Sequence, residues 1–274
     1  MSVSGNGHPH PSPLPRAGEG ALRHAHSGPL KQAGEGALLA LTGVNTHIGH
    51  YHILQGVDFA VAQGGFTMLL GRNGAGKTTC LRTIMGMWRA SAGRIIFDGA
   101  DIAGEETPAV ARRGIGYVPE AMGIFAGLSV AENLTLAARD GPIDTSRLEW
   151  IFGFFPALKK FWNLPAGNLS GGQKQMLAVA RAIIEPRKLL LIDEPTKGLA
   201  PAIIGHMIEA FRELKRTDTT ILLVEQNFNF ARALGDTVAV MDSGRIIHTG
   251  AMADLAGDPG LQQQLLGLSL DAHQ

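Results

Sequence analysis

The chain of 274 residues carries 24 Lys and Arg side chains against 24 Asp and Glu, and 45% of its residues are hydrophobic. This composition is typical of a globular protein with one large domain or two modest ones. The balanced charge argues against an extensive basic surface, so we expect no nucleic-acid partner. A single cysteine, Cys80, excludes internal disulfides and cysteine metal cages. No apolar run approaches the roughly 20 residues of a membrane-spanning helix, so a membrane role would need a partner chain.

The segment 1–36 is rich in Pro, Gly, Ser and His and has no apolar periodicity. We interpret it as a disordered, low-complexity tail, and it has no apolar stretch that fits a signal peptide. Its two histidine pairs, His8 with His10 and His24 with His26, could bind a metal, but solvated histidines are the simpler interpretation.

After this tail the pattern changes to short apolar runs separated by turn residues. These runs predict the strands Leu38–Val44, Val57–Val61, Phe66–Leu70 and Gly93–Asp98, with a helix at Thr79–Met87. Short strands joined by turns indicate an antiparallel layer.

Between the third of these strands and the helix lies a sequence that fits the pattern of a phosphate-binding loop. Its glycines let backbone N–H groups converge on a polyphosphate, Lys77 would contact the outer phosphates, and the Thr78 hydroxyl could ligate Mg²⁺. A chance match in a chain with 36 glycines is the alternative, and the strand before and the helix after argue against it. The predicted nucleotide-binding residues here are Gly71, Arg72, Asn73, Gly74, Ala75, Gly76, Lys77, Thr78 and Thr79.

After a short strand at Gly116–Pro119, the region 121–168 reads as helical and irregular, and we predict that it is an insert in an α/β core. It includes a helix at Ser129–Arg139, which Ser129 and Glu132 begin as a capping box. The aromatic residues here could form a groove for a partner, although the insert's own core is the simpler interpretation. They are Phe125, Phe152, Phe154, Phe155, Phe161 and Trp162.

The helix Gly171–Ile184 has the clearest period, with one apolar face. Ser170 is placed as its N-cap, and the glycines that follow expose backbone N–H groups at a positive helix end. The sequence Leu169-Ser170-Gly171-Gly172-Gln173 therefore predicts either a second anion site or only a capped helix.

The strand Lys188–Ile192 reads as buried on both faces and is followed directly by Asp193 and Glu194. Carboxylates at the C-terminal end of such a strand lie where open α/β sheets bind ligands. Asp193 would hold Mg²⁺ and Glu194 would polarise the attacking water. Two acids that merely begin a turn are the alternative, which the upstream phosphate loop makes the weaker one.

The rest of the chain alternates helices and strands, which indicates a mainly parallel sheet. The predicted elements are the helix Ile203–Lys215, the strand Thr220–Val224, the helix Phe228–Leu234, a hairpin of Val238–Met241 with Arg245–His248, and a polar helix with a frayed end over 251–274.

A phosphate loop, then Leu-Ser-Gly-Gly-Gln, then a strand ending in Asp-Glu-Pro resembles the ATPase subunit of ABC transporters over about residues 38–270. The resemblance implies a P-loop NTPase with a mainly parallel core sheet, an antiparallel β subdomain and a helical insert. The domains would be a tail at 1–36, the ABC ATPase domain at 37–250 with its insert at about 121–168, and a C-terminal helix and tail at 251–274. In this family two such domains pair head to tail around ATP. Ser170, Gly171, Gly172 and Gln173 would therefore act on the nucleotide of a second ATPase subunit.

Three shorter stretches resemble the high-affinity branched-chain amino-acid uptake ATPases, whose close relatives serve urea and amides. They are Gly116-Tyr117-Val118-Pro119-Glu120, Gly198-Leu199-Ala200-Pro201 and Val224-Glu225-Gln226-Asn227. The wider family usually has Gln at Glu120, His at Gln226 and an Asp-bearing loop at 198–201. Gln226 cannot become positively charged but could hydrogen-bond the γ-phosphate or water. Glu120 can still ligate Mg²⁺ or water.

The family usually stacks an aromatic residue on adenine in the stretch before the second strand. Alignment on Gly49 puts Ile48 there, as an apolar platform, and His47 or Tyr51 could assist it. With His50 and His52 nearby, a histidine metal site is an alternative, and surface-loop histidines are the simpler interpretation.

The resemblance implies an ATP-binding, ATP-hydrolysing subunit of a multi-chain importer, with ATP and Mg²⁺ as cofactors and Glu194 and Gln226 as catalytic residues. It would sit peripherally on the cytoplasmic face of the inner membrane, bound to transmembrane permease subunits and acting indirectly with a periplasmic solute-binding protein. Alternatives are urea or amide uptake, lipid or lipopolysaccharide export, a soluble DNA-repair or translation ATPase, and an inactive binding module. Neutral charge and a single nucleotide domain argue against a soluble DNA-repair or translation ATPase. Intact Lys77, Thr78, Asp193 and Glu194 argue against an inactive binding module.

Overall fold

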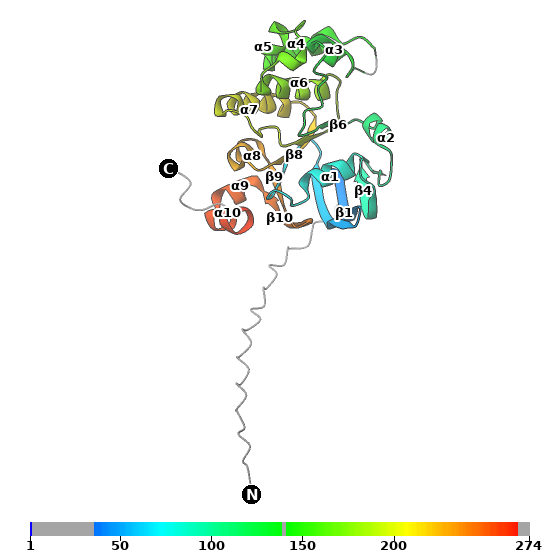
Figure 1. Ribbon diagram of the computed structural model, residues 1–274, viewed down its shortest axis with the longest axis vertical. Coiled ribbons are helices and arrows are strands. Elements are labelled where there is room, and N and C mark those ends of the chain that lie inside the picture. The colour runs from blue at the N-terminus through cyan, green and yellow to red at the C-terminus, as the bar shows by residue number, and fades with distance from the viewer. Residues whose placement is uncertain (2–35, 139–140, 268–274) are drawn as a thin grey trace. The chain divides into compact units, whose positions relative to one another are not determined.

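The computed structural model describes residue 1, residues 36–138 and residues 141–267. The predicted tail, apart from its first and last residues, lies outside the described residues, and so does the end of the predicted C-terminal segment, 268–274. The described part contains two sheets with helices packed against them (Figure 1).

The larger sheet has six strands in the order β10-β9-β3-β8-β7-β6. Every neighbouring pair is parallel except the β9–β10 hairpin, which confirms the prediction of a mainly parallel core sheet. The strands are β3 (Phe66–Leu70), β6 (Ile115–Val118), β7 (Leu189–Asp193), β8 (Thr220–Glu225), β9 (Thr237–Asp242) and β10 (Arg245–Ala251).

The smaller sheet is antiparallel, in the order β2-β1-β4-β5, as the short strands predicted. Its strands are β1 (Ala37–Ile48), β2 (Tyr51–Ala62), β4 (Ala90–Phe97) and β5 (Ala100–Asp101). Strands β1 and β2 extend further toward the turn that joins them than predicted. The prediction ended them too early because register shifts between Leu41 and Val44 and between Thr46 and His47 interrupt the alternation that marks a strand.

Ten α-helices are described. They are α1 (Lys77–Ile84), α2 (Thr107–Arg112), α3 (Val130–Thr135), α4 (Thr145–Phe154), α5 (Pro156–Lys160), α6 (Gly171–Ile183), α7 (Pro201–Lys215), α8 (Phe228–Leu234), α9 (Met252–Gly257) and α10 (Pro259–Leu266), with a 3₁₀ turn at Ala166–Asn168. The capping box predicted at Ser129 is present, with Glu132 N donating to Ser129 Oγ over 3.1 Å. The helix it begins ends at Thr135, earlier than predicted, and Arg139 lies outside the described residues.

The prediction of one C-terminal helix after residue 251 is wrong, because two helices, α9 and α10, occupy this segment. Asp258 separates them, and its side chain accepts a hydrogen bond from Leu261 N over 3.0 Å. Pro259 follows as the first residue of α10, where a missing N–H costs nothing, whereas a proline cannot continue the helix before it.

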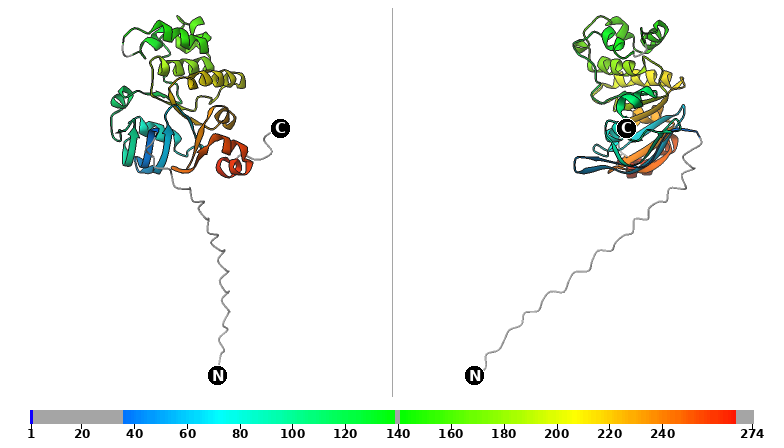
Figure 2. Two further views of the ribbon diagram at one scale, coloured as in Figure 1. Left: turned by 180° about the vertical axis from the view of Figure 1, so that it is seen from behind. Right: turned by 90° about the vertical axis from the view of Figure 1, so that its right-hand side faces the viewer.

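The two faces of the larger sheet belong to different hydrophobic clusters, because neighbouring residues of a strand point to opposite sides. Met68 and Leu70 of β3 join helices α6, α7 and α8 in one cluster, while Leu69 joins α1 and the antiparallel sheet in the other. Both views of Figure 2 show the helices α3–α6 (green) at one end and the antiparallel sheet (blue to cyan) at the other.

The aromatic residues of the predicted insert belong mainly to the first of these clusters. Phe152 and Phe155 are buried there, and Phe154, Phe161 and Trp162 pack against it. Phe125 is 49% exposed. Phe152 and Phe155 therefore fit the core interpretation, and a partner groove formed by the partly buried rings stays a prediction.

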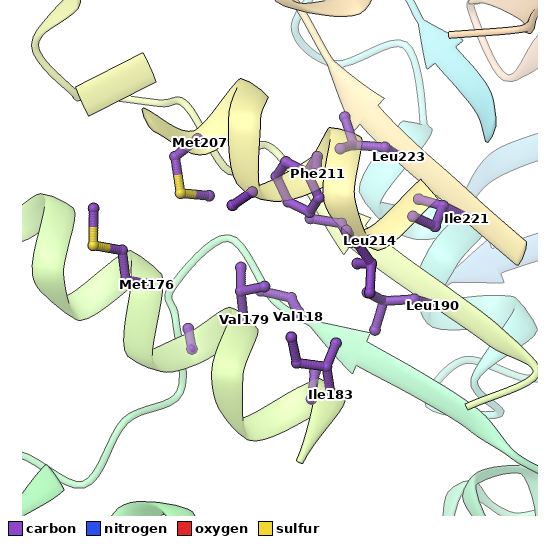
Figure 3. Close-up of a cluster of buried hydrophobic side chains, with 14 of the residues drawn as sticks. Val118, Met176, Val179, Ile183, Leu190, Met207, Phe211, Leu214, Ile221 and Leu223 are labelled. Atoms are coloured by element: carbon purple, nitrogen blue, oxygen red, sulfur yellow. The ribbon is translucent and has the colours of Figure 1, made fainter. Parts of the chain in front are cut away.

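Helices α6 and α7 meet over the central strands, where apolar side chains from both helices lie between them and the sheet (Figure 3). Phe211 is at the centre of this packing and is 1% exposed. Its ring meets Phe66 of β3 and Phe230 of α8 edge to face, with centroid separations of 6.2 Å and 6.0 Å.

We expect Phe211→Ala to lower the free energy of unfolding by roughly 3–5 kcal/mol, since it removes two edge-to-face contacts and leaves a cavity under β3. Urea denaturation followed by circular dichroism measures the change. Phe125→Ala removes the same atoms from an exposed position and should cost less than about 1 kcal/mol. Equal losses for the two variants would contradict the packing described here.

Candidate functional site

The phosphate loop follows β3 at the C-terminal edge of the parallel sheet and leads into α1 at Lys77. Two of its glycines are required by the backbone. Gly71 has a φ of 153°, and a Cβ there would lie 2.2 Å from Met241 O of β9. Gly76, the N-cap of α1, has a φ of 108°, in the region that side chains disfavour. The predicted loop conformation therefore depends on glycine at both positions.

Lys77 is 4% exposed, and its ammonium group lies inside the curl of the loop. The Nζ atom donates to Gly71 O over 2.8 Å and to Arg72 O over 3.1 Å, and it lies 3.6 Å from Glu194 Oε1. The loop therefore holds a buried positive charge at a position where it can bind an anionic group.

Asp193 is the last residue of β7 and is fully buried. Thr78 Oγ1 donates to its Oδ1 over 3.0 Å, and the Tyr117 hydroxyl donates to its Oδ2 over 3.4 Å. Burial raises the pKa of Asp193 to about 6, and the negative charges of Glu194 and Glu120 act in the same direction against the hydrogen bond from Thr78. A nearby cation would relieve this unfavourable charge.

Glu194 has a φ of 47°, a left-handed conformation that costs a non-glycine residue roughly 1–2 kcal/mol. Its N–H donates to Val224 O of β8 over 3.0 Å. Its side chain accepts a hydrogen bond of 2.7 Å from Gln226 Nε2, which also donates to Asn73 Oδ1 over 2.6 Å. Gln226 therefore connects the phosphate loop to the predicted water-polarising carboxylate.

Nine of the predicted residues line one cavity of about 330 Å³, while Gly71, Arg72 and Gln226 line a second cavity of about 280 Å³ that also includes Asn73. The lining of the larger cavity consists of Ile53, Asn73, Gly74, Ala75, Gly76, Lys77, Thr78, Thr79, Glu120, Glu194 and Lys197. The structure thus gathers the loop after β3, the segment after β6 and the turn after β7, which are far apart in the sequence.

Ile48 is not among the lining residues of this cavity in the described part of the chain, whereas Ile53 of β2 is. Ile48 lies half-buried at the end of β1, opposite Tyr51, which is 76% exposed. His47 stacks on His52, with ring centroids 4.2 Å apart. The role of Ile48 at the adenine therefore stays a prediction.

The signature residues lie elsewhere. Ser170 and Gln173 form a capping box at the start of α6 and line a separate cavity beside α7. A Cβ on Gly172 would lie 2.7 Å from the Ile203 side chain, whereas nothing lies within 4 Å of one on Gly171. The structure therefore does not bring the signature to the phosphate loop of its own chain within the described residues.

Thr78, Asp193 and Glu120 supply only oxygen donors, the atoms that Mg²⁺ prefers. Within the described residues no three His, Cys, Asp or Glu side chains gather as a metal cage. Mg²⁺ does not need such a cage, because protein sites commonly bind it through one or two carboxylates and substrate phosphates. The donor set therefore fits a magnesium ion bound together with a nucleotide.

Besides Ile53, two further residues of the site were not predicted. Lys197 lies 2.5 Å from Glu120 Oε1 and 3.7 Å from Glu194 Oε2. Glu225 ends β8, directly beside the strand that carries the predicted carboxylates. The rule that ligand groups follow parallel strands could have found Glu225, and the positive charge three residues after Glu194 could have drawn attention to Lys197.

Cys80 lies in the first turn of α1 and is fully buried. Burial raises the pKa of its thiol to about 12, which leaves almost no reactive thiolate at neutral pH. This agrees with the interpretation of Cys80 as a small packing residue.

Comparisons with known families, sequences and structures agree with the nucleotide site described above. A family model described as "ABC transporter" matches residues 54–197. The chain is 37% identical over 232 residues to the high-affinity branched-chain amino acid transport ATP-binding protein BraG of Pseudomonas aeruginosa, a match that covers 84% of this chain and 100% of that protein. It is 28% identical over 231 residues to the glutamine transport ATP-binding protein GlnQ of Geobacillus stearothermophilus, covering 82% and 96%.

Among solved structures, a nucleotide-free ATP-binding cassette from an ABC transporter superposes with a TM-score of 0.72 at 25% identity and covers 85% of this chain and 99% of that chain. No helix among the described residues is long and apolar enough to cross a membrane. The fold, the order of the motifs and these similarities agree: the chain belongs to the ABC transporter family, as one of its ATP-binding, ATP-hydrolysing subunits.

Proposed function

We propose that this subunit powers a multi-chain importer of branched-chain amino acids from the cytoplasmic face of the inner membrane. The observation that carries the proposal is the match over the full length of BraG, whose name assigns it to high-affinity branched-chain amino acid transport. The partners would be transmembrane permease subunits, a second ATPase subunit and, indirectly, a periplasmic solute-binding protein.

In this proposal the phosphate loop binds the triphosphate of ATP. Lys77, already held at the loop carbonyls, contacts the outer phosphates, and the N–H groups at the start of α1 add their positive partial charge. Ile48 is proposed as the platform for adenine, and Ile53, which lines the cavity, extends that apolar surface.

Thr78, Asp193 and Glu120 would hold Mg²⁺, which neutralises charge on the β- and γ-phosphate oxygens when bound. Asp193 is held in place by its contacts with Thr78 and Tyr117. Glu194 would accept the proton of the attacking water, and Gln226, which already touches Glu194 and Asn73, would orient that water or the γ-phosphate.

One chain supplies half of each site in this proposal. Ser170 and Gln173 face a different cavity from the phosphate loop, so the signature of a second subunit would have to complete the site. ATP would hold the two subunits together, hydrolysis would release them, and the permease would follow this motion.

Reconstitution of the chain with its permease subunits and solute-binding protein in liposomes tests the proposal. We expect leucine, isoleucine or valine, presented with the binding protein, to stimulate ATP hydrolysis and to enter the vesicles. Stimulation by urea, an amide, methionine or glutamine in place of these solutes would overturn the assignment of substrate. Outward movement of a lipid would overturn the assignment as an importer.

A further inference from the structure

Glu225 is a buried carboxylate with no role in the function proposed so far. It is 3% exposed and ends β8, whose residue Val224 pairs with Asp193 of β7. The strands thus place it beside the turn that carries Glu194. Because a buried charge is costly unless hydrogen bonds satisfy it, a carboxylate at this position needs an explanation.

Four hydrogen bonds reach this carboxylate, two on each oxygen. Oε1 accepts from Thr196 N over 3.0 Å and from Thr196 Oγ1 over 2.6 Å. Oε2 accepts from Gln226 N over 2.9 Å and from Asn227 N over 3.0 Å. One oxygen therefore binds the turn after Glu194, and the other binds the segment of Gln226.

The two segments that Glu225 joins are those of the proposed catalytic residues. Thr196 lies two residues after Glu194, whose strained left-handed backbone must be held by its surroundings. On the other side, Gln226 has its N–H bound to Glu225 while its side-chain amide donates to Glu194 over 2.7 Å. Glu225 thus binds the backbone close to both partners of the Glu194–Gln226 hydrogen bond.

We propose that Glu225 is a positioning residue that sets the distance and orientation between Glu194 and Gln226. The inference rests on the proposed catalytic roles of those two residues. A carboxylate suits all four donors, whereas a glutamine amide has one accepting oxygen and turns its NH₂ group toward at least one N–H group in either orientation. A misplacement of about 1 Å at a reacting centre can cost a factor of 100 in rate.

The test compares Glu225→Gln with the wild-type protein, and ATPase assays give kcat and KM. We expect kcat to fall roughly 10- to 100-fold while KM for ATP stays within about twofold, because the phosphate loop is untouched. Thr196→Val, which removes one hydrogen bond without changing side-chain shape, should also lower kcat. Thr196→Ser should recover most of that loss because it restores the hydroxyl.

A matched control is Thr67→Val. Thr67 is also buried and loses one hydroxyl contact, to Thr237 Oγ1 at 2.9 Å, but it lies inside β3 and away from the cavity. It should lower the melting temperature about as much as Thr196→Val and leave kcat unchanged. An equal fall in kcat for both valine variants would show a general loss of stability and overturn the positioning role.

A double-mutant cycle separates positioning from folding further. If Glu225 acts through Gln226, the loss caused by Glu225→Gln should be smaller in a Gln226→Ala background. Full additivity would overturn the inference, and so would an unchanged kcat in Glu225→Gln. If Glu225→Gln does not fold, the two Thr196 variants decide the question in the same way.

The wild-type rate is measured first, because it separates this inference from the proposed function. An inactive wild-type dimer would overturn the proposed function. An active wild type with an unaffected Glu225→Gln variant would overturn this inference alone.

Discussion

Glu194→Gln is expected to lower the kcat for ATP hydrolysis by roughly 100- to 10,000-fold, the range for loss of a general base. The amide has almost the shape of the carboxylate but cannot accept a proton from water. Glu194 is the residue whose carboxylate matters here because it lines the cavity between Gln226 Nε2, at 2.7 Å, and Lys77 Nζ, at 3.6 Å. Steady-state release of phosphate measures the change.

The same variant should keep its affinity for ATP, since the phosphate loop is intact. ATP-bound dimers should therefore accumulate, and size-exclusion chromatography with and without ATP would detect them. Glu106→Gln makes the same chemical change at an exposed residue before α2, away from the cavity, and should leave the rate unchanged. Hydrolysis by Glu194→Gln at the wild-type rate would show that another group activates the water.

Lys77→Ala is expected to weaken ATP binding by about 2–5 kcal/mol, or roughly 30- to 4,000-fold. The ammonium is buried and held by two carbonyl oxygens of the loop, so its loss removes the charge that faces the phosphates and leaves Glu194 without its closest cation. Titration with a fluorescent ATP analogue measures the affinity.

Lys188→Ala serves as the comparison for this variant. Lys188 is exposed and forms an ion pair with Asp98. It immediately precedes β7, at the opposite end of that strand from Asp193. Its removal should leave the ATP affinity unchanged. Wild-type affinity in Lys77→Ala would place the triphosphate somewhere other than this loop.

Those parts of the site that are continuous in the sequence could be predicted from it. The phosphate loop is one segment whose glycines answer a local need, shown by the φ of 108° at Gly76, which side chains disfavour. Asp193 ends one buried strand and Glu194 follows it, and the position of ligand groups at strand ends does not depend on which strands are neighbours.

Those parts that depend on pairing between distant segments could not be predicted. The position of Glu225 at a strand end is visible in the sequence, but its contact with Thr196 depends on the pairing of β7 with β8. The register shift between Thr46 and His47 leaves Ile53 between Leu54, which pairs with Thr46, and His52, which pairs with His47, and Ile53 rather than Ile48 lines the cavity. A bulge of this kind leaves no clear mark in the hydrophobic pattern.

The burial of Cys80 has a practical consequence for measuring how two copies of this chain approach one another. The chain has one thiol, and its raised pKa and complete burial keep it from alkylating reagents at neutral pH. A cysteine introduced at an exposed position away from the site, such as Ala253 of α9, would therefore be the one thiol open to a fluorophore or cross-linker. Distances between copies could then be followed by spectroscopy without first removing a native residue.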